Sequence, residues 1–396
     1  MSEWKGYSIE ELFQVQGRIG WKGYKRTDLV DSGPIVVGGR EINSELFLDL
    51  SDVKHLSRVK YEESPEIMLK PEDVLVVCRG NLAEVGIYHK EYGEGTLNPS
   101  VVLLRSRGVI SPLYGFYYLS SSIGRAQLLS ISSGSSVPAI YQSSLKTLQL
   151  PVPDRDTQNG IVEILKSLDD KIDLLHRQNR TLEQMAETLF RQWFVEEADE
   201  GWEEVNIESL FEVRDGTHDS PKKQELGKKL ITSRHLKPNY IDFKNAYFIS
   251  EEDYLAVNKR SKVEKGDILF SMIGTIGNLF LEESDSVDYA IKNIGLFKTS
   301  QNPKWRYFTY LWLKSDLGSQ FIHENRSGST QEYISLGNLR SIAFYVESES
   351  QVSEFNSVVN QLFKKIKSNQ TQIRTLTALR DTLLPKLMSG EVRVDI

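Results

Sequence analysis

The sequence lacks the residues and runs that mark several common protein classes. Its 396 residues contain one cysteine, Cys78, which excludes an intramolecular disulfide and any site built from several cysteine ligands. The six histidines are scattered, without the close pairs typical of metal ligands. No run of about 18 apolar residues is present, and the first residues lack a basic stretch followed by an apolar one. These absences predict a cytoplasmic protein with no membrane partner and no metal site.

The charge of the chain is unevenly distributed. The net charge is −7, which argues against a uniformly basic protein. Residues 151–200, however, hold six Lys and Arg against twelve Asp and Glu. The acidic surplus therefore lies in one short segment, and the rest of the chain is nearly neutral, with many cations available to gather on a surface.

An internal repeat organises the sequence. When the chain is compared with itself at an offset of 194 residues, Asp73 aligns with Asp267, Gly80 with Gly274, and many further landmarks align in the same way. Upstream, Trp4 aligns with Trp202 at an offset of 198. Because a period of this length far exceeds that of solenoid repeats, each copy is predicted to be a domain.

Each copy contains short strands and amphipathic helices in mixed order. The strands are apolar, β-branched runs bounded by Gly, Pro or Asp, and they are predicted at 73–78, 100–104, 267–271 and 294–297. Helices are predicted at 113–129 and 305–325. This order favours an α+β fold over a doubly wound sheet.

Each copy ends in a long segment with a heptad pattern. Apolar residues recur in alternating steps of four and three from Ile161 to Trp193 and from Phe355 to Leu387, which is typical of a coiled coil. Pro151 and Pro153 precede the first segment, and Pro385 lies near the end of the second. The predicted division is a first domain at 1–152, a central long helix at 153–196, a second domain at 197–346 and a C-terminal long helix at 347–396.

The two long helices are predicted to pair antiparallel. A centred register places Asn179, which interrupts the first seam, opposite Asn369, which interrupts the second, whereas parallel pairing leaves both amides unmatched. The alternative is that each helix packs independently on its own domain. The residues expected to pair the helices are Leu168, Ile172, Leu175, Asn179, Leu182, Leu362, Ile366, Asn369, Ile373 and Leu376.

The sequence contains no complete catalytic constellation. It has neither a Walker loop nor a strand followed by G-x-G-x-x-G, and it lacks the [N/D]-P-P-[Y/F] string of DNA amino-methyltransferases. Asp154, Asp169 and Lys171 mimic a nuclease pattern, but Asp169 and Lys171 fall on the heptad helix rather than on adjacent strands. We therefore expect a binding protein with no catalytic residues.

Several strings resemble those of specificity (S) subunits of type I restriction-modification systems. The resemblance is carried by 150–158, 161–172 and 189–194 at the centre of the chain, by Asp215-Gly-Thr-His-Asp-Ser-Pro221 and Gly274-Thr-Ile-Gly277, and by 383–391. The first copy departs from these strings at 18–24 and 80–86.

The resemblance implies two tandem target-recognition domains, each reading one half of a split double-stranded DNA target, with the antiparallel helices as a ruler between them. A helix of 37 residues, 158–194, is about 55 Å long, roughly one and a half turns of DNA. The resemblance also implies docking of two DNA methyltransferase (modification) subunits and of restriction or motor subunits. S-adenosylmethionine, ATP and magnesium would be bound by those partners, and this chain would bind no cofactor.

Polar side chains of the loops are the candidates for contact with DNA, because Arg, Lys, Asn, Gln and hydroxyl groups read bases and bind phosphates. In the first copy they are Arg18, Lys22, Lys25, Arg26, Arg40, Arg79, Tyr141 and Gln142. In the second copy they are Arg214, His218, Lys222, Lys223, Lys228, Arg234, His235, Gln331 and Tyr333. Two other hypotheses are a specificity subunit of an orphan or type II-like methyltransferase or nuclease, and a coiled-coil scaffold that binds no DNA.

Overall fold

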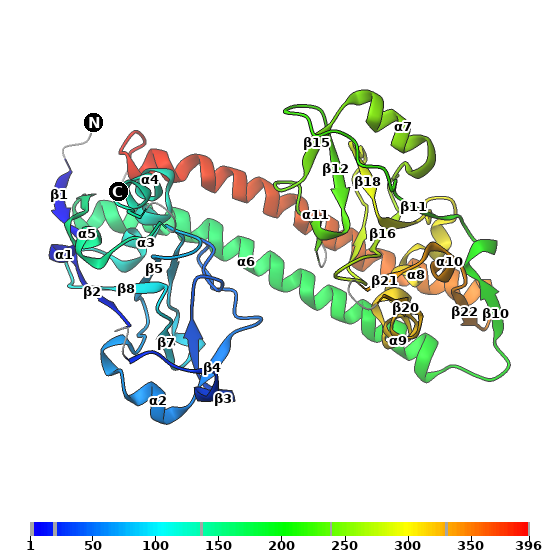
Figure 1. Ribbon diagram of the computed structural model, residues 1–396, viewed down its shortest axis with the longest axis horizontal. Helices are drawn as coiled ribbons and strands as arrows, with labels where there is room; N and C mark the ends of the chain where they lie inside the picture. Colours follow the sequence, from blue (N-terminus) through cyan, green and yellow to red (C-terminus); the bar gives the residue numbers. More distant parts are fainter. Residues whose placement is uncertain (1–3, 19–21, 135–137, 238–239, 329–331, 395–396) are drawn as a thin grey trace. The chain divides into compact units, whose positions relative to one another are not determined.

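The computed structural model describes residues 4–18, 22–134, 138–237, 240–328 and 332–394, and it divides into two compact units. The first unit comprises Met1–Leu174 and Gln372–Ile396, and the second comprises Leu175–Thr371. Each unit therefore contains one copy of the repeat together with part of both long helices (Figure 1).

A four-stranded antiparallel sheet lies at the centre of the first unit. Its strand order is β2 (Phe13–Gly17), β8 (Val101–Ser106), β5 (Val74–Val77) and β6 (Val85–Ile87). Every residue of β5 is buried, as expected for a short, wholly apolar run in the middle of a sheet. A second sheet has the order β4 (Lys54–Leu56), β3 (Leu29–Val37), β7 (Gly95–Leu97), and β1 (Lys5–Ser8) pairs with β9 (Gln149–Val152).

Short helices accompany the sheets of the first unit. They are α1 (Ile9–Leu12), α2 (Arg58–Glu62), α3 (Pro112–Ser120), α4 (Ser122–Ser130) and α5 (Gln142–Thr147). All but α2, whose Tyr61 packs with Val36 and Leu56 of the second sheet, contribute to the core shared with the long helices. α3 buries Tyr114, Phe116 and Tyr117 in a core that also contains Val74 of the sheet and Ile161 of the first long helix. Sheet, helices and long helices thus share one hydrophobic core.

The second unit repeats this arrangement. Its central sheet has the order β11 (Val213–Asp215), β19 (Ile294–Phe297), β16 (Ile268–Ser271), β17 (Leu279–Leu281), and a second sheet has the order β15 (Tyr247–Ile249), β12 (Lys228–Thr232), β18 (Tyr289–Lys292). Two-stranded pairs are β10 (Glu203–Asn206) with β22 (Ala343–Val346), β13 (Leu236–Lys237) with β14 (Tyr240–Ile241), and β20 (Arg326–Ser327) with β21 (Tyr333–Ile334). The helices are α7 (Glu251–Ser261), α8 (Arg306–Lys314), α9 (Asp316–Asn325) and α10 (Leu336–Arg340).

The structure confirms the repeat and the mixed α+β order. β16 lies 194 residues after β5, and α8 lies 194 residues after α3. β10 follows β1 at the predicted offset of 198. The four predicted strands of the central sheets are all present: β19 has the predicted ends, and the other three differ from the predicted ends by at most two residues.

The helices predicted at 113–129 and 305–325 are each interrupted, so that prediction was too coarse. α3 ends before Ser121, whose hydroxyl accepts from the backbone N–H of Gly124 and so caps α4. Ser315 caps α9 in the same way through Gly318. A side chain at either glycine would collide with the carbonyls that end the preceding helix, so the serine cap and the glycine together allow the chain to turn sharply.

The two long helices are α6 (Arg155–Arg191) and α11 (Glu349–Met388). α6 begins inside the predicted segment 153–196, three residues before the 158–194 stretch used for the length estimate, and it passes into a π-helical turn, Gln192–Glu196. Pro385 does not end α11, because the helix continues past it to Met388.

Contacts between α6 and α11 confirm the predicted antiparallel register. In the second unit the Asn369 side-chain N–H donates to the Asn179 carbonyl oxygen at 2.9 Å, and the rings of Trp193 and Phe355 lie 5.7 Å apart. In the first unit Ile161 and Leu387 belong to one core. Of the predicted pairing residues, Leu175, Asn179, Ile366 and Asn369 are buried, and Leu168, Ile172, Leu182, Leu362, Ile373 and Leu376 are half-buried.

Candidate nucleic-acid interface

In the first unit, several candidate residues lie at one end of the central sheet. At this end Gly17 of β2 pairs with Val102 of β8, and Val101 of β8 pairs with Val77 of β5. The loops that leave this end carry Arg79 after β5 and Gln142 at the start of α5. The Gln142 side chain lies against Gly17, and Arg79 pairs with Ala139 through backbone contacts. Loops far apart in sequence are thus brought together.

Most candidates of the first unit present their side chains to solvent. Lys22 is half-buried, and its ammonium lies 3.3 Å from the Glu66 carboxylate. The exposed candidates are Lys25, Arg26, Arg40, Arg79, Tyr141 and Gln142. Their side chains are cations, an aromatic ring and an amide, the groups that bind phosphates and base edges.

Arg18 is the exception, because its side chain is only 7% exposed. Its guanidinium donates to the Leu97 carbonyl at 2.7 Å, to the Thr96 hydroxyl at 2.9 Å and to the Lys22 carbonyl at 3.1 Å. Burial lowers the pKa of Arg18 from its ordinary value. In this structure Arg18 therefore ties β7 to the loop after β2, in a buried position that does not expose its guanidinium.

In the second unit the corresponding sheet end holds a small polar cluster. The exposed ring of His218 contacts the Asp215 carboxylate at 2.9 Å and the Asn293 amide oxygen at 3.0 Å. Gly216 is required here because a Cβ would lie 2.5 Å from the Ile291 carbonyl. Exposed Tyr333 joins the same end, since its strand pairs with Ile273 just after β16.

The remaining candidates of the second unit differ in how accessible they are. Arg214 donates to the Arg260 carbonyl at 2.9 Å and pairs with Glu212, so it holds the end of α7. Half-buried Lys228 pairs with Asp288. His235 is 2% exposed and accepts from the Thr232 backbone N–H, which makes it part of the interior. Lys222, Lys223 and Arg234 are exposed, and Gln331 lies outside the described residues.

Two residues at the same sheet end were missed by the sequence analysis. Half-buried Lys292 and Asn293 precede β19, beside the Asp215–His218 turn; the Lys292 ammonium lies 2.5 Å from the Ser220 hydroxyl. Asn293 has a positive φ of 54°, which is unusual for a residue other than glycine. The pairing of β11 with β19 and the bridge between Thr217 and Lys292 bring these residues to the cluster, and neither pairing is visible in one sequence.

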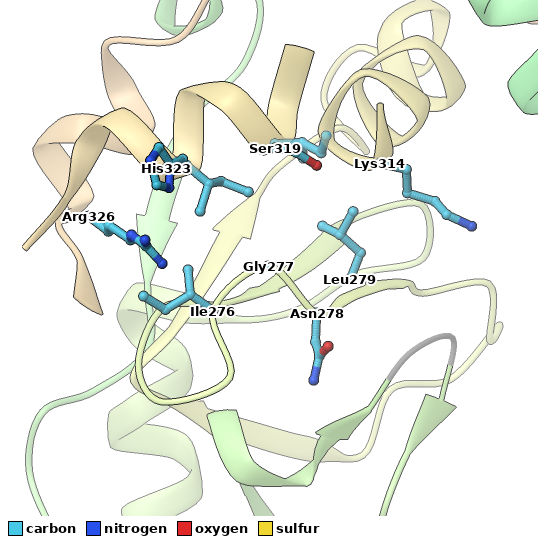
Figure 2. Close-up of a pocket in the computed structure, with 10 residues that line it drawn as sticks. Ile276, Gly277, Asn278, Leu279, Lys314, Ser319, His323 and Arg326 are labelled. Carbon is cyan, nitrogen blue, oxygen red and sulfur yellow. The ribbon is translucent and has the colours of Figure 1, made fainter. Parts of the chain in front are cut away.

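A pocket of about 460 Å³ lies beside this region of the second unit. Figure 2 shows the loop Ile276–Leu279 facing His323 and Arg326, with Lys314 directed away. Lys314 pairs instead with Glu183 and Glu187 of α6, at 3.3 and 2.8 Å. At the equivalent positions of the first unit, Glu84 and Arg125 form an ion pair at 2.6 Å, whereas here Asn278 and Ser319 leave space. The pocket therefore distinguishes the two copies.

The described residues offer little for catalysis. Among them, no three His, Cys, Asp or Glu side chains are grouped as metal ligands. Burial raises the pKa of the Cys78 thiol to about 12, which disfavours the reactive thiolate. No helix in the described part of the chain is long and apolar enough to cross a membrane. The chemistry at both sheet ends is that of a polar binding surface.

Comparison with known proteins identifies the family. The type I restriction modification DNA specificity domain matches residues 1–184 and again 199–377. The MjaIX specificity subunit of Methanocaldococcus jannaschii is 27% identical over 73% of this chain and 70% of its own length. The HindI specificity subunit of Haemophilus influenzae is 22% identical over 99% of this chain and 100% of its own length.

A solved structure shares the fold. The S subunit of a type I restriction-modification system from M. genitalium has a TM-score of 0.57 and 17% identity, covering 97% of this chain and 96% of that one. The two domain matches span most of the chain, in agreement with the repeat seen in both sequence and structure. The chain therefore belongs to the family of type I restriction-modification DNA specificity subunits, the non-catalytic members of these methyltransferase and nuclease complexes.

Proposed function

We propose that this chain recognises a bipartite double-stranded DNA target, with each unit reading one half. The observation that carries the proposal is the pair of repeat-related sheet ends, where exposed polar side chains from separate loops gather. The scaffold of the two units is repeated, but these loops differ, as expected for two readers of different half-sites.

The accessible candidates make up the proposed surface. In the first unit they are Lys25, Arg26, Arg40, Arg79, Tyr141 and Gln142. In the second unit they are His218, Lys222, Lys223, Arg234 and Tyr333, with Lys292 and Asn293 added by the structure. Arg18 and His235 are left out because both are buried. Half-buried Lys22, Arg214 and Lys228 are left out because each pairs with a carboxylate.

The proposal includes the partners expected of such a subunit. Two DNA methyltransferase subunits would dock on the chain and supply S-adenosylmethionine and the methyl-transfer chemistry. Restriction or motor subunits would supply ATP, magnesium and cleavage. This chain would contribute the choice of sequence, which accords with a surface rich in polar groups and with the family of its relatives.

The test is DNA binding by a Lys222→Ala, Lys223→Ala double variant, assembled with a methyltransferase subunit from the same system. Both lysines are exposed in the loop after β11. Each phosphate contact that is lost should reduce the slope of log affinity against log salt by about 0.9. We expect weaker binding and a shallower slope, measured by fluorescence anisotropy between 50 and 200 mM salt, roughly the range over which such contacts are resolved.

Lys304→Ala provides the matched control. Lys304 is also exposed, but it follows β19 at the opposite end of the sheet and lies 3.5 Å from Glu349. Its loss should leave affinity and slope unchanged. If the double variant binds as the parent does at every salt concentration, the loop after β11 does not contact DNA.

A further inference from the structure

A buried ion pair joins the two long helices in the first unit. The Arg380 guanidinium lies 2.8 Å from one oxygen of the Asp169 carboxylate, and the Tyr117 hydroxyl donates to the other oxygen at 2.8 Å. The side chain of Asp169 is 5% exposed and that of Arg380 is 16% exposed. α6, α11 and α3 thus meet at a charged, fully partnered contact inside the helix seam.

The repeat places different residues at the equivalent point of the second unit. An offset of 194 aligns Asp169 with Phe363, Arg380 with Ala186, and Tyr117 with Leu311. These three residues belong to the hydrophobic core of the second unit. The charged contact therefore occurs once, and its two charges are divided between the helices: the acid is on α6 and the base is on α11.

We propose that Asp169 and Arg380 make the seam of α6 selective for α11 and reject a second copy of α6. If α6 paired with itself in the corresponding antiparallel register, Asp169 would face Ala186. If α11 paired with itself, Arg380 would face Phe363. Two self-paired seams would leave two carboxylates and two guanidiniums without the opposite charge across the seam, because only Tyr117 would still contact Asp169 and only Asp381 would still contact Arg380. Two mixed seams leave no such charge uncompensated.

The asparagine pair adds to this selectivity. Asn369 donates to Asn179 in the mixed seam, but self-pairing would set Asn179 against Leu175 and Asn369 against Ile373. An unpartnered buried charge is much more costly than an unpartnered amide. The ion pair should therefore dominate, with a preference for mixed seams on the order of a hundredfold.

The experiment uses the full-length chain, opened after folding. Residues 197–201 are exposed and lie between the π-helical turn and β10, so a protease site inserted there can be cut in the native protein. Isotope-labelled and unlabelled nicked proteins are then mixed, incubated to allow exchange, and analysed by native mass spectrometry. We expect the halves to exchange only into mixed pairs of one first half and one second half.

Three variants separate charge from packing. Arg380→Met keeps the apolar stem but removes the charge, and it should raise self-paired halves at least tenfold. Arg380→Lys keeps the charge and should retain the preference. Asp170→Asn is the matched control, because Asp170 is exposed and pairs with Lys166 on the surface of α6; it should behave as the parent does.

Two results would overturn the proposal. One is a statistical mixture of self-paired and mixed halves from the parent protein. The other is an unchanged ratio for Arg380→Met when a double-mutant cycle with Asp169→Asn, made in the intact chain, gives additive changes in the free energy of unfolding. Neither result bears on DNA recognition, so this proposal and the proposed function fail independently.

Discussion

The same buried aspartate is neutralised by a different residue in each copy of the repeat. Asp73 accepts from the Arg105 guanidinium at 2.6 and 2.7 Å. Its counterpart Asp267 is completely buried and contacts the Lys298 ammonium at 2.6 Å. Lys298 aligns with Leu104 rather than with Arg105. The repeat thus preserves a compensated charge at this point, although the cation comes from a neighbouring position.

Lys298→Met should destabilise the second unit, because it leaves the Asp267 carboxylate buried without a cation. The expected fall in the free energy of unfolding is about 3–5 kcal/mol, measured by urea denaturation. Lys265→Met is the control, since Lys265 pairs with exposed Asp285 and should change stability by less than about 1 kcal/mol. Equal effects of the two substitutions would contradict a special role for the buried pair.

His235 should make the stability of the second unit depend on pH. Its pKa lies below 6.5, first because burial disfavours the imidazolium and then because of the positive charge of Arg234. The unfolded chain therefore binds the proton more tightly than the folded chain does. The stabilisation is present above about pH 6.5 and is lost as the pH falls below that value.

Thermal unfolding between pH 7.5 and 5.5 measures this effect. The midpoint of the parent protein should fall with acid more steeply than that of His235→Gln, which cannot take up a proton. Parallel pH profiles would show that His235 does not titrate differently in the two states.

At the scale of the elements, the asparagine pair sets the register of the long helices at some cost. The carbonyl oxygen of Asn369 has no hydrogen-bond partner, and the residue is completely buried. Asn369→Leu alone should lower the free energy of unfolding by about 1–3 kcal/mol, because the Asn179 amide then loses its partner. The double variant with Asn179→Leu should regain the lost stability, which thermal melts of the single and double variants measure. A double variant less stable than either single variant would contradict this account.

The elements that follow from local pattern could be predicted from the sequence. β5 is a uniformly apolar run and β16 is apolar up to Ser271. The heptads of α6 and α11 carry matching asparagines, so the strands, the long helices and their register could all be predicted. The breaks at Ser121 and Ser315 were not predicted, because a serine cap followed by a glycine resembles ordinary helix surface until the close backbone approach is seen.

Contacts between segments far apart in the chain could not be predicted from the sequence. Asp169 lies beside the heptad seam, and only its distance to Arg380 shows that it belongs to the helix interface. The same holds for the candidate site. Arg18 and His235 are of residue types usually found at the surface, but both are buried in the structure. Lys292 and Asn293 reach the site through strand pairing.

At the scale of the whole molecule, the repeat predicts that specificity is modular. Replacing residues 1–150 with the equivalent domain of a relative should change one half of the methylated sequence and leave the other half and the spacing unchanged. Methylome sequencing of cells that carry the matching methyltransferase measures this directly. The purified chain alone should show no methylation, and a change in both halves of the target would contradict separate readout.

The first and last described residues of the chain pack on the same core. Trp4 and Val394 both pack against the hydrophobic cluster of the first unit, near the first turns of α6. A short linker would therefore close the polypeptide into a ring, and the exposed segment 197–201 is a natural place to open it again. Such a circular permutant would present the second copy first and the first copy last, with every core contact retained. Its thermal midpoint should match that of the parent, because the fold does not depend on which copy comes first in the chain.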